Sequence, residues 1–163
     1  MILYLDTSAL VKLYFREPFS DDILLKWQSA AQIVASSVAY AETMASIYRK
    51  NREGDLEGSL LRGVVASFHR DWGSLIRVEV SDELNAYIAR AVKRYPLRGF
   101  DLVHLASAMV IRERLPEDFV FACFDDRLAR AAQSEGFETF PPAEATVRQQ
   151  ENQCVTQADH EDD

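Results

Sequence analysis

Four acidic residues, far apart in the chain, are the side chains whose positions suggest chemistry. Asp6 and Asp125 each follow an apolar run, whereas Glu42 and Asp101 each lie near the start of a predicted helix. If these carboxylates lay together, they would repel one another and raise each other's pKa unless cations neutralised them. Oxygen ligands of this kind favour Mg²⁺ or Mn²⁺, and such ions support phosphodiester hydrolysis by activating water and stabilising the leaving oxygen.

A zinc site is not indicated, because the histidines and cysteines do not cluster in the sequence; they are His69, His104, His160, Cys123 and Cys154. His104 follows Asp101 by one helical turn on an apolar helix, and we interpret it as a packed, hydrogen-bonded histidine rather than a ligand.

The acidic residues also have structural interpretations. Asp6 and Asp101 could cap the helices that follow them, and Asp125-Asp126 could be a turn followed by a cap. Glu42 is harder to explain in this way, because it lies among alanines on a predicted buried face, where an unpaired carboxylate is destabilising.

The strands and helices that must position these residues alternate along the chain. Apolar and alternating patterns predict strands at 2–5, 32–36, 75–80, 119–124 and 137–140. Helical periodicity and breakers predict helices at 9–15, 20–31, 38–52, 56–71, 81–95, 102–114 and 127–134. This order predicts an α/β fold, a three-layer α/β/α sandwich with a central parallel sheet. Strand ends and the starts of the following helices share one edge of such a sheet, so the four acids should converge there.

Composition predicts one domain over residues 1–142 and an acidic, disordered tail over residues 143–163. The chain has 163 residues, of which 48% are hydrophobic, and a formal charge of -8. From Glu144 onward there are six acidic residues and one arginine, a net charge of -5, which leaves -3 for the body. The broad basic surface typical of non-specific nucleic-acid binding is therefore missing.

Cellular context follows from the termini, the cysteines and the hydropathy. Two cysteines do not form a disulfide framework, and no leader or bilayer-spanning run is visible. We expect a cytoplasmic protein with no membrane association.

Four segments of the chain resemble, in order, the motifs of the PIN-domain nucleases, specifically the ribonuclease toxins of VapBC toxin–antitoxin pairs. They are LDTSAL at 5–10, ASSVAYAE at 35–42, DLVHLASA at 101–108 and CFDDRL at 123–128. The resemblance extends from Ile2 to about Phe140. Any one motif is weak, but the ordered set is specific.

The resemblance implies a Mg²⁺- or Mn²⁺-dependent endoribonuclease. Asp6, Glu42 and Asp101 are expected to hold the first metal, and Asp125 to complete the cage or help bind a second metal. Activated water would attack the phosphorus in line and leave a 5′-phosphate and a 3′-hydroxyl. Thr7 or Ser8 would orient Asp6 or the water from the second shell.

Two details of the fourth motif stay open. Cys123 stands where the family usually has a hydroxyl that supports the metal site, so this support is expected to differ. Either Asp125 or Asp126 could be the site acid. The Asp-x-x-Leu register favours Asp125 and leaves Asp126 to cap the next helix.

The resemblance also implies partners. RNA phosphates would be bound first by Arg98 and Arg127, which flank Asp101 and Asp125; the wider candidate set adds Lys12, Arg16, Arg49, Lys93 and Arg94. A VapB-type antitoxin would bind a groove formed by Leu13, Tyr14, Phe15, Trp27 and Tyr48, although each of these could equally be core. A homodimer is also expected.

Other functions remain open at this level. A PIN-fold RNA-processing nuclease without an antitoxin has the same sequence features, and a non-catalytic PIN-fold binding module could retain the fold. A phosphatase that uses Asp6 as nucleophile is a further alternative. Such enzymes commonly have a second aspartate two residues on, where this chain has Ser8.

Overall fold

The sheet is built around the strand that the sequence marks most strongly, β1 (Ile2–Leu5), which is buried along its whole length. The computed structural model describes residues 1–115 and 117–142. Its sheet has the order β3-β2-β1-β4-β5 and every pairing is parallel. The other strands are β2 (Gln32–Ser36), β3 (Ile76–Val78), β4 (Phe119–Ala122) and β5 (Glu138–Phe140).

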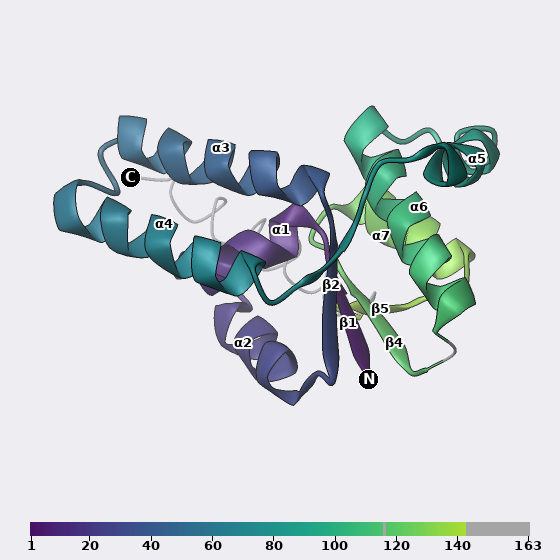
Figure 1. Cartoon of the computed structure of the whole chain (residues 1–163), viewed down its shortest axis with the longest axis horizontal. Coiled ribbons are helices and arrows are strands. Elements are labelled where there is room, and N and C mark those ends of the chain that lie inside the picture. The colour runs from purple at the N-terminus through teal and green to yellow at the C-terminus, as the bar shows by residue number, and fades with distance from the viewer. Residues whose placement is uncertain (116, 143–163) are drawn as a thin grey trace, which may run out of the picture.

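Two groups of helices cover the two faces of this sheet, as Figure 1 shows. On one side lie α1 (Thr7–Leu10), the 3₁₀ helix η1 (Val11–Leu13), α2 (Ser20–Ser29), α3 (Val38–Arg52) and α4 (Gly58–Trp72). On the other side lie α5 (Asp82–Ala91), α6 (Gly99–Arg114) and α7 (Asp126–Ser134). The predicted α/β/α sandwich with a central parallel sheet is confirmed.

The alternation of side chains along β1 divides the core into two halves. Leu3 and Leu5 pack with the core on the α1–α4 side, whereas Ile2 and Tyr4 pack with the core on the α6–α7 side. Successive residues of a strand point to opposite faces, so a continuous apolar run is what a strand covered on both faces requires.

The bounds of three helices differ from the prediction. The helix predicted at 9–15 starts two residues earlier, directly after Asp6, and is divided into α1 and η1, which ends at Leu13. The helix predicted from Leu102 begins three residues earlier, which makes Asp101 its third residue. The helix predicted at 81–95 ends as α5 at Ala91 and continues as turns.

The predicted acidic tail, residues 143–163, lies outside the described residues. Within the described ranges, no helix has the length and apolar character needed to cross a membrane.

Candidate active site

Asp6 is a buried carboxylate at the end of the central strand, with only 5% of its surface exposed. It is the N-cap of α1, because its Oδ1 accepts a hydrogen bond from the Ala9 backbone nitrogen at 2.9 Å. The Ser8 hydroxyl donates to both of its oxygens, at 2.7 and 2.9 Å. Burial raises the pKa of Asp6, and the nearby His104 together with these hydrogen bonds only partly opposes that effect. The hydrogen bonds that make Asp6 a helix cap therefore do not offset the cost of burying its negative charge.

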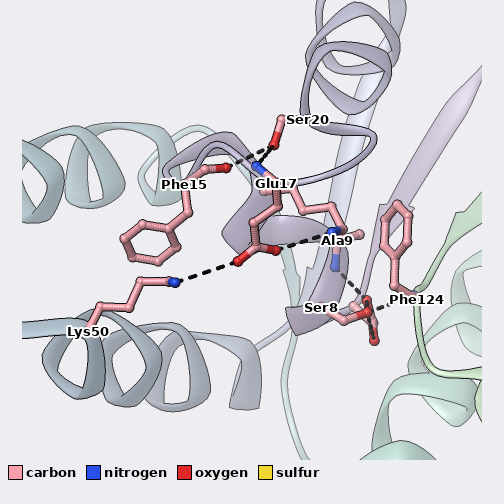
Figure 2. Close-up of polar contacts among 9 residues, drawn as sticks. Ser8, Ala9, Phe15, Glu17, Ser20, Lys50 and Phe124 are labelled. Carbon is pink, nitrogen blue, oxygen red and sulfur yellow. Dashed lines mark hydrogen bonds and ion pairs between the residues drawn. The ribbon is translucent and has the colours of Figure 1, made fainter. Parts of the chain in front are cut away.

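Ser8 joins this end of β1 to the chain that leaves β4. Its hydroxyl oxygen accepts a hydrogen bond from the backbone nitrogen of Phe124 at 2.7 Å, across 116 positions of sequence. Figure 2 shows the two residues facing each other. Because the same hydroxyl donates to Asp6, Ser8 fixes the distance between the ends of two neighbouring strands.

Glu42 is held by two donors from the other elements at this edge of the sheet. The Thr7 hydroxyl lies 2.5 Å from its Oε2 atom, and Nε2 of His104 lies 2.9 Å from the same oxygen. Burial by itself would raise the pKa of Glu42, but these hydrogen bonds outweigh it and lower the pKa. Both donors engage Oε2, which leaves Oε1 for another ligand.

Asp101 lies in the first turn of α6 and is partly buried. Its Oδ2 atom accepts a hydrogen bond from the Arg98 backbone nitrogen at 3.3 Å. Arg98, not Asp101, is the N-cap of α6, so the interpretation of Asp101 as the cap was wrong; Asp101 bonds back to the cap from the third helical position. Burial is the main cause that raises the pKa of Asp101, and the negative charge of Asp125 raises it further. Asp125 therefore lies near enough for its charge to affect the pKa of Asp101.

The fourth motif contains one correction. Asp125, not Asp126, is the N-cap of α7, since its Oδ1 accepts from the backbone nitrogens of Arg127 and Leu128 at 2.9 and 3.0 Å. Asp126 is the first residue of the helix. The prediction that Asp126 caps this helix was wrong because α7 begins one residue earlier than expected, at Asp126 itself, which leaves Asp125 in the capping position.

Cys123 lies between Asp6 and Asp125. Its sulfur accepts from the Asp125 backbone nitrogen at 3.3 Å, and burial, with a further contribution from the charge of Asp6, raises the pKa of its thiol. The thiol thus braces the backbone of Asp125 in the place where a hydroxyl was expected.

We call the four acids the acidic site. Hydrogen bonds and electrostatic effects on their pKa values connect them at the carboxyl edge of the sheet. In the part of the chain that the structure describes, no three acidic, histidine or cysteine side chains lie close enough to hold one ion as they stand. The site nevertheless fits a hard cation, because Asp6 is buried, its pKa is raised, and no lysine, arginine or histidine of residues 1–115 and 117–142 forms a salt bridge with it.

Of the lysines and arginines expected to bind RNA phosphates, some already form salt bridges within the protein. Lys12 bonds Glu17 at 3.2 Å and lies 4.3 Å from the Phe124 ring centre, and Arg94 bonds Glu135 at 2.8 Å. Figure 2 shows Glu17 also reaching Lys50.

Arg98 and Arg127 are exposed, and neither forms a salt bridge with a carboxylate among the described residues, although the charge of Arg98 acts to lower the pKa of Asp101. They remain the two cations that sequence position and structure both place beside Asp101 and Asp125. Arg16, Arg49 and Lys93 are exposed as well.

Sequence reasoning missed one residue of this region, Tyr4. Its hydroxyl lies 3.1 Å from Nδ1 of His104. The apolar run around Tyr4 gave no signal of a polar role, and only the position of His104 on a distant helix reveals it.

Fold and site together define an α/β protein with carboxylates gathered at the carboxyl edge of a parallel sheet. The family model described as PIN domain matches residues 3–134, and the chain belongs to this family.

Individual relatives agree with this assignment. Ribonuclease VapC46 of Mycobacterium tuberculosis (strain ATCC 25618 / H37Rv) is 34% identical over 142 residues, which cover 86% of this chain and 98% of the relative. Among solved structures, VapBC2 from Rickettsia felis bound to a promoter DNA fragment matches with a TM-score of 0.57 and 14% identity, covering 85% of this chain and 97% of that one. A toxin-antitoxin complex from Klebsiella pneumoniae matches with a TM-score of 0.56 and 14% identity, covering 78% and 90%. The structural matches support the fold.

Proposed function

We propose that this protein is a divalent-metal-dependent endoribonuclease and the toxin of a type II toxin–antitoxin pair. The observation that carries the proposal is the unneutralised, buried carboxylate of Asp6 at an edge where three further acids gather. A relative that is 34% identical and named a ribonuclease supports the choice of RNA as the substrate.

Asp6, Glu42 and Asp101 would hold Mg²⁺ or Mn²⁺, with Asp125 completing the set or serving a second ion. When bound, the ion supplies charge to activate water and to stabilise the leaving oxygen. The chain's own residues orient these ligands: Ser8 and the Ala9 backbone fix Asp6.

Thr7 and His104 fix Glu42 in the same way. Arg98 and Arg127, at the beginnings of α6 and α7, would bind the phosphates on either side of the cut bond.

The direct test is cleavage of total RNA by purified protein with Mn²⁺, with Mg²⁺ and with excess chelator, followed by mapping of the cut ends. We expect cleavage only with metal, and 5′-phosphate ends. Asp6→Asn and Asp101→Asn should abolish cleavage, while Asp22→Asn, at an exposed acid in the first turn of α2, should not change it. Metal-independent cleavage, or wild-type rates in Asp6→Asn, would refute the proposal.

An antitoxin partner is supported by two adjoining cavities on the helical side of the fold. One, of about 480 Å³, lies between η1 and α4, and the other, of about 200 Å³, lies between η1 and α2. Both are lined by Leu13 and Tyr14, and Leu24 and Leu60 flank them with 45% and 61% of their surfaces exposed. We propose this groove, which combines exposed leucines with polar side chains, as the antitoxin site; a solved structure of the same fold that is described as a toxin-antitoxin complex supports the existence of such a partner.

The groove agrees in part with the residues expected for it. Leu13, Tyr14 and Phe15 line these cavities, whereas Trp27 and Tyr48 line neither. The partner is tested by co-expression with the product of any small reading frame that lies directly upstream in the genome: the two should co-purify, and Leu60→Asp should separate them without stopping RNA cleavage. An RNA-processing nuclease without an antitoxin would cleave RNA but capture no such product, and a non-catalytic binding module would bind RNA without cutting it.

We also propose a homodimer, as expected from the family resemblance. Light scattering of the purified chain should give twice the mass of 18.5 kDa. A monomer mass at all concentrations would exclude it.

A further inference from the structure

A cavity of about 480 Å³ lies between α5, α6 and the end of α7, and its charged lining is mostly basic. We call it the basic cavity. Figure 1 shows these three helices together on one side of the sheet. The charged side chains that line the cavity are four cations and two acids: Arg90, Lys93, Arg94, Arg112, Glu113 and Glu135. This local excess of positive charge contrasts with residues 1–143 as a whole, which carry a net charge of -3.

Arg112 is the only one of the four cations that is half-buried; the others are exposed. Its Nη1 donates to the backbone carbonyl of Glu135 at 2.7 Å, and its guanidinium carbon lies 3.9 Å from the ring centre of Phe137. Both partners are neutral groups, and Arg112 forms no salt bridge with a carboxylate of residues 1–115 or 117–142. Partial burial of an unpaired charge is unfavourable, and the guanidinium has donors left, so the position is suited to an anion.

The two acids of the basic cavity hold two of its arginines in place. Nη1 of Arg94 lies 2.8 Å from Oε1 of Glu135, and the Tyr95 hydroxyl donates to the same oxygen at 2.7 Å. In the same way, Nη2 of Arg90 lies 3.7 Å from Oε1 of Glu113. Because two acids face four cations, these contacts orient the arginines without cancelling the positive charge of the cavity.

The neighbouring cavity shows that this excess of cations is not a general feature of the surface of α5 and α6. It has about 250 Å³ and lies between β3, α5 and α6. Its charged side chains are two arginines and two glutamates, Arg77, Arg114, Glu79 and Glu83, so they balance. Arg114 also pairs with Glu83.

The type of cation and the size of the basic cavity indicate the ligand. Planar guanidinium groups bind phosphate oxygens through two parallel hydrogen bonds, and a lysine adds a point charge. Three arginines and one lysine therefore favour a phosphate group. A volume of about 480 Å³ lies in the range of sites for organic ligands, so a phosphate that belongs to a larger molecule fits better than a free ion.

α6 connects the basic cavity to the acidic site. Asp101 lies in the first turn of this helix and Arg112 eleven residues later, which corresponds to about 17 Å along the helix axis. The segment between α5 and α6 carries three exposed cations, Lys93, Arg94 and Arg98, and ends where α6 begins. A stacked nucleic-acid strand rises about 3.4 Å per nucleotide, so about five nucleotides would span this distance.

We propose that the basic cavity is a further RNA-binding site, which holds a backbone phosphate of the substrate about five nucleotides from the cut bond. Arg112 and Lys93 bind this phosphate, and Arg90 and Arg94 complete its surroundings. The protein therefore prefers RNAs that extend beyond the cut. The identity of the ligand as the substrate rests on the proposed function. The affinity of the cavity for phosphate does not, because it follows from the charge of the lining and the unpaired Arg112.

Phosphate binding is measured by NMR on metal-free, full-length protein labelled with ¹⁵N-arginine. The probes are inorganic phosphate and a single-stranded RNA of about ten nucleotides, twice the estimated span. We expect the Nε–H signal of Arg112 to shift and saturate with both probes, while that of Arg77 moves little. An Arg112 signal that moves no more than that of Arg77 would overturn the site. Saturation with inorganic phosphate but no response to RNA would make it a site for a small phosphate ligand and overturn the RNA assignment.

The role in substrate binding is measured with two RNAs in the cleavage-inactive Asp101→Asn protein. One ends close to the mapped cut on both sides, and the other extends about ten nucleotides beyond it. The longer RNA should bind more tightly, and Arg112→Gln should reduce this advantage about 10-fold, as expected for the loss of a hydrogen bond between charged groups. Lys93→Gln should reduce the advantage too, and should flatten the slope of log K against log salt by about 0.7.

Arg77→Gln is the matched control, because it removes one exposed arginine from the balanced neighbouring cavity and should leave the advantage of the longer RNA unchanged. Lys93→Gln decides the test if Arg112→Gln does not fold, since Lys93 is exposed and forms no salt bridge within the described residues. Equal losses for the short and the long RNA, or the same loss in Arg77→Gln, would overturn the proposal.

Two further outcomes separate this proposal from the others. A changed mass of Lys93→Gln in light scattering would place the basic cavity between two copies of the chain and overturn its role in RNA binding. Wild-type protein that cleaves no RNA would overturn the proposed function, and the NMR titration would then decide by itself whether the cavity binds phosphate.

Discussion

The hydroxyl of Thr7 lies 2.5 Å from the carboxylate of Glu42, although 35 positions of sequence separate the two residues. This contact joins the start of α1 to the second turn of α3 across the carboxyl edge of the sheet. Thr7 therefore holds Glu42 in place, rather than Asp6.

The first prediction concerns this hydroxyl. Thr7→Val should raise the pKa of Glu42 and lower the free energy of unfolding at pH 7 by about 1 kcal/mol, because a donor to a carboxylate is lost. A carboxyl group with a lowered pKa stabilises the fold above its unfolded pKa of about 4.3 and loses this contribution as the pH falls through its folded pKa. The difference between variant and wild type should therefore shrink below about pH 4. Urea unfolding at several pH values measures it, and Thr7→Ser should behave as wild type.

The second prediction is that Asp6→Asn stabilises the metal-free protein while abolishing its proposed activity. The raised pKa of Asp6 means that ionisation is unfavourable in the folded state, so stability falls as pH rises through the range between its unfolded and folded pKa. The amide oxygen of asparagine can still cap α1. We expect a gain of about 1 kcal/mol at pH 7 that disappears in acid, where the wild-type carboxyl is protonated.

Thermal unfolding with and without Mn²⁺ checks the second prediction. Added metal should stabilise the wild type and not Asp6→Asn. If metal stabilised both proteins equally, Asp6 would not be a ligand.

The third prediction separates capping from charge at Asp125. Asparagine is as good an N-cap as aspartate, whereas alanine is worse by about 1 kcal/mol. Asp125→Asn should therefore keep the thermal stability of the wild type but lose RNA cleavage, and Asp125→Ala should lose both. If Asp125→Asn cleaved RNA at the wild-type rate, Asp125 would be a cap alone.

The fourth prediction concerns the link between the two strand ends. Ser8→Ala removes the acceptor of the Phe124 backbone nitrogen and both hydroxyl contacts to Asp6, so it should destabilise the fold by about 2 kcal/mol. Ser134→Ala, which removes an exposed hydroxyl bonded to the Arg130 carbonyl, should change stability little. Equal effects of the two substitutions in chemical unfolding would contradict a structural role for Ser8.

The fifth prediction concerns RNA contacts. Each true phosphate contact contributes about 0.7 to the slope of log K against log salt for a single strand, so Arg98→Ala and Arg127→Ala should each flatten that slope by about this amount. Arg114→Ala is the control, because Arg114 lies at the end of α6 that is farthest from Arg98 and forms a salt bridge with Glu83 of α5. Binding of the RNA to catalytically inactive Asp101→Asn protein at several salt concentrations measures the slopes. An unchanged slope would return that arginine to ordinary surface charge.

Local sequence determined the fold class and the choice of candidate site residues. The uninterrupted apolar run before Asp6, and a second one before Asp125, require strands that are covered on both faces, and helices between them make the sheet parallel. Parallel strands end at one edge, so four acids placed at strand ends and helix starts are expected to lie near that edge. This is why Asp6, Glu42, Asp101 and Asp125 could be chosen without a structure.

Only the tertiary structure decided what each of these groups touches. The strand periodicity puts Tyr4 on the α6 side of β1, but it does not say that the imidazole of His104, 100 positions away, lies 3.1 Å from its hydroxyl. The cap of α7 depends on the residue at which the helix begins, which the motif spacing did not fix. Hydrogen bonds and pKa shifts depend on distances of a few tenths of an ångström, which the packing of the whole chain sets and no local stretch of sequence encodes.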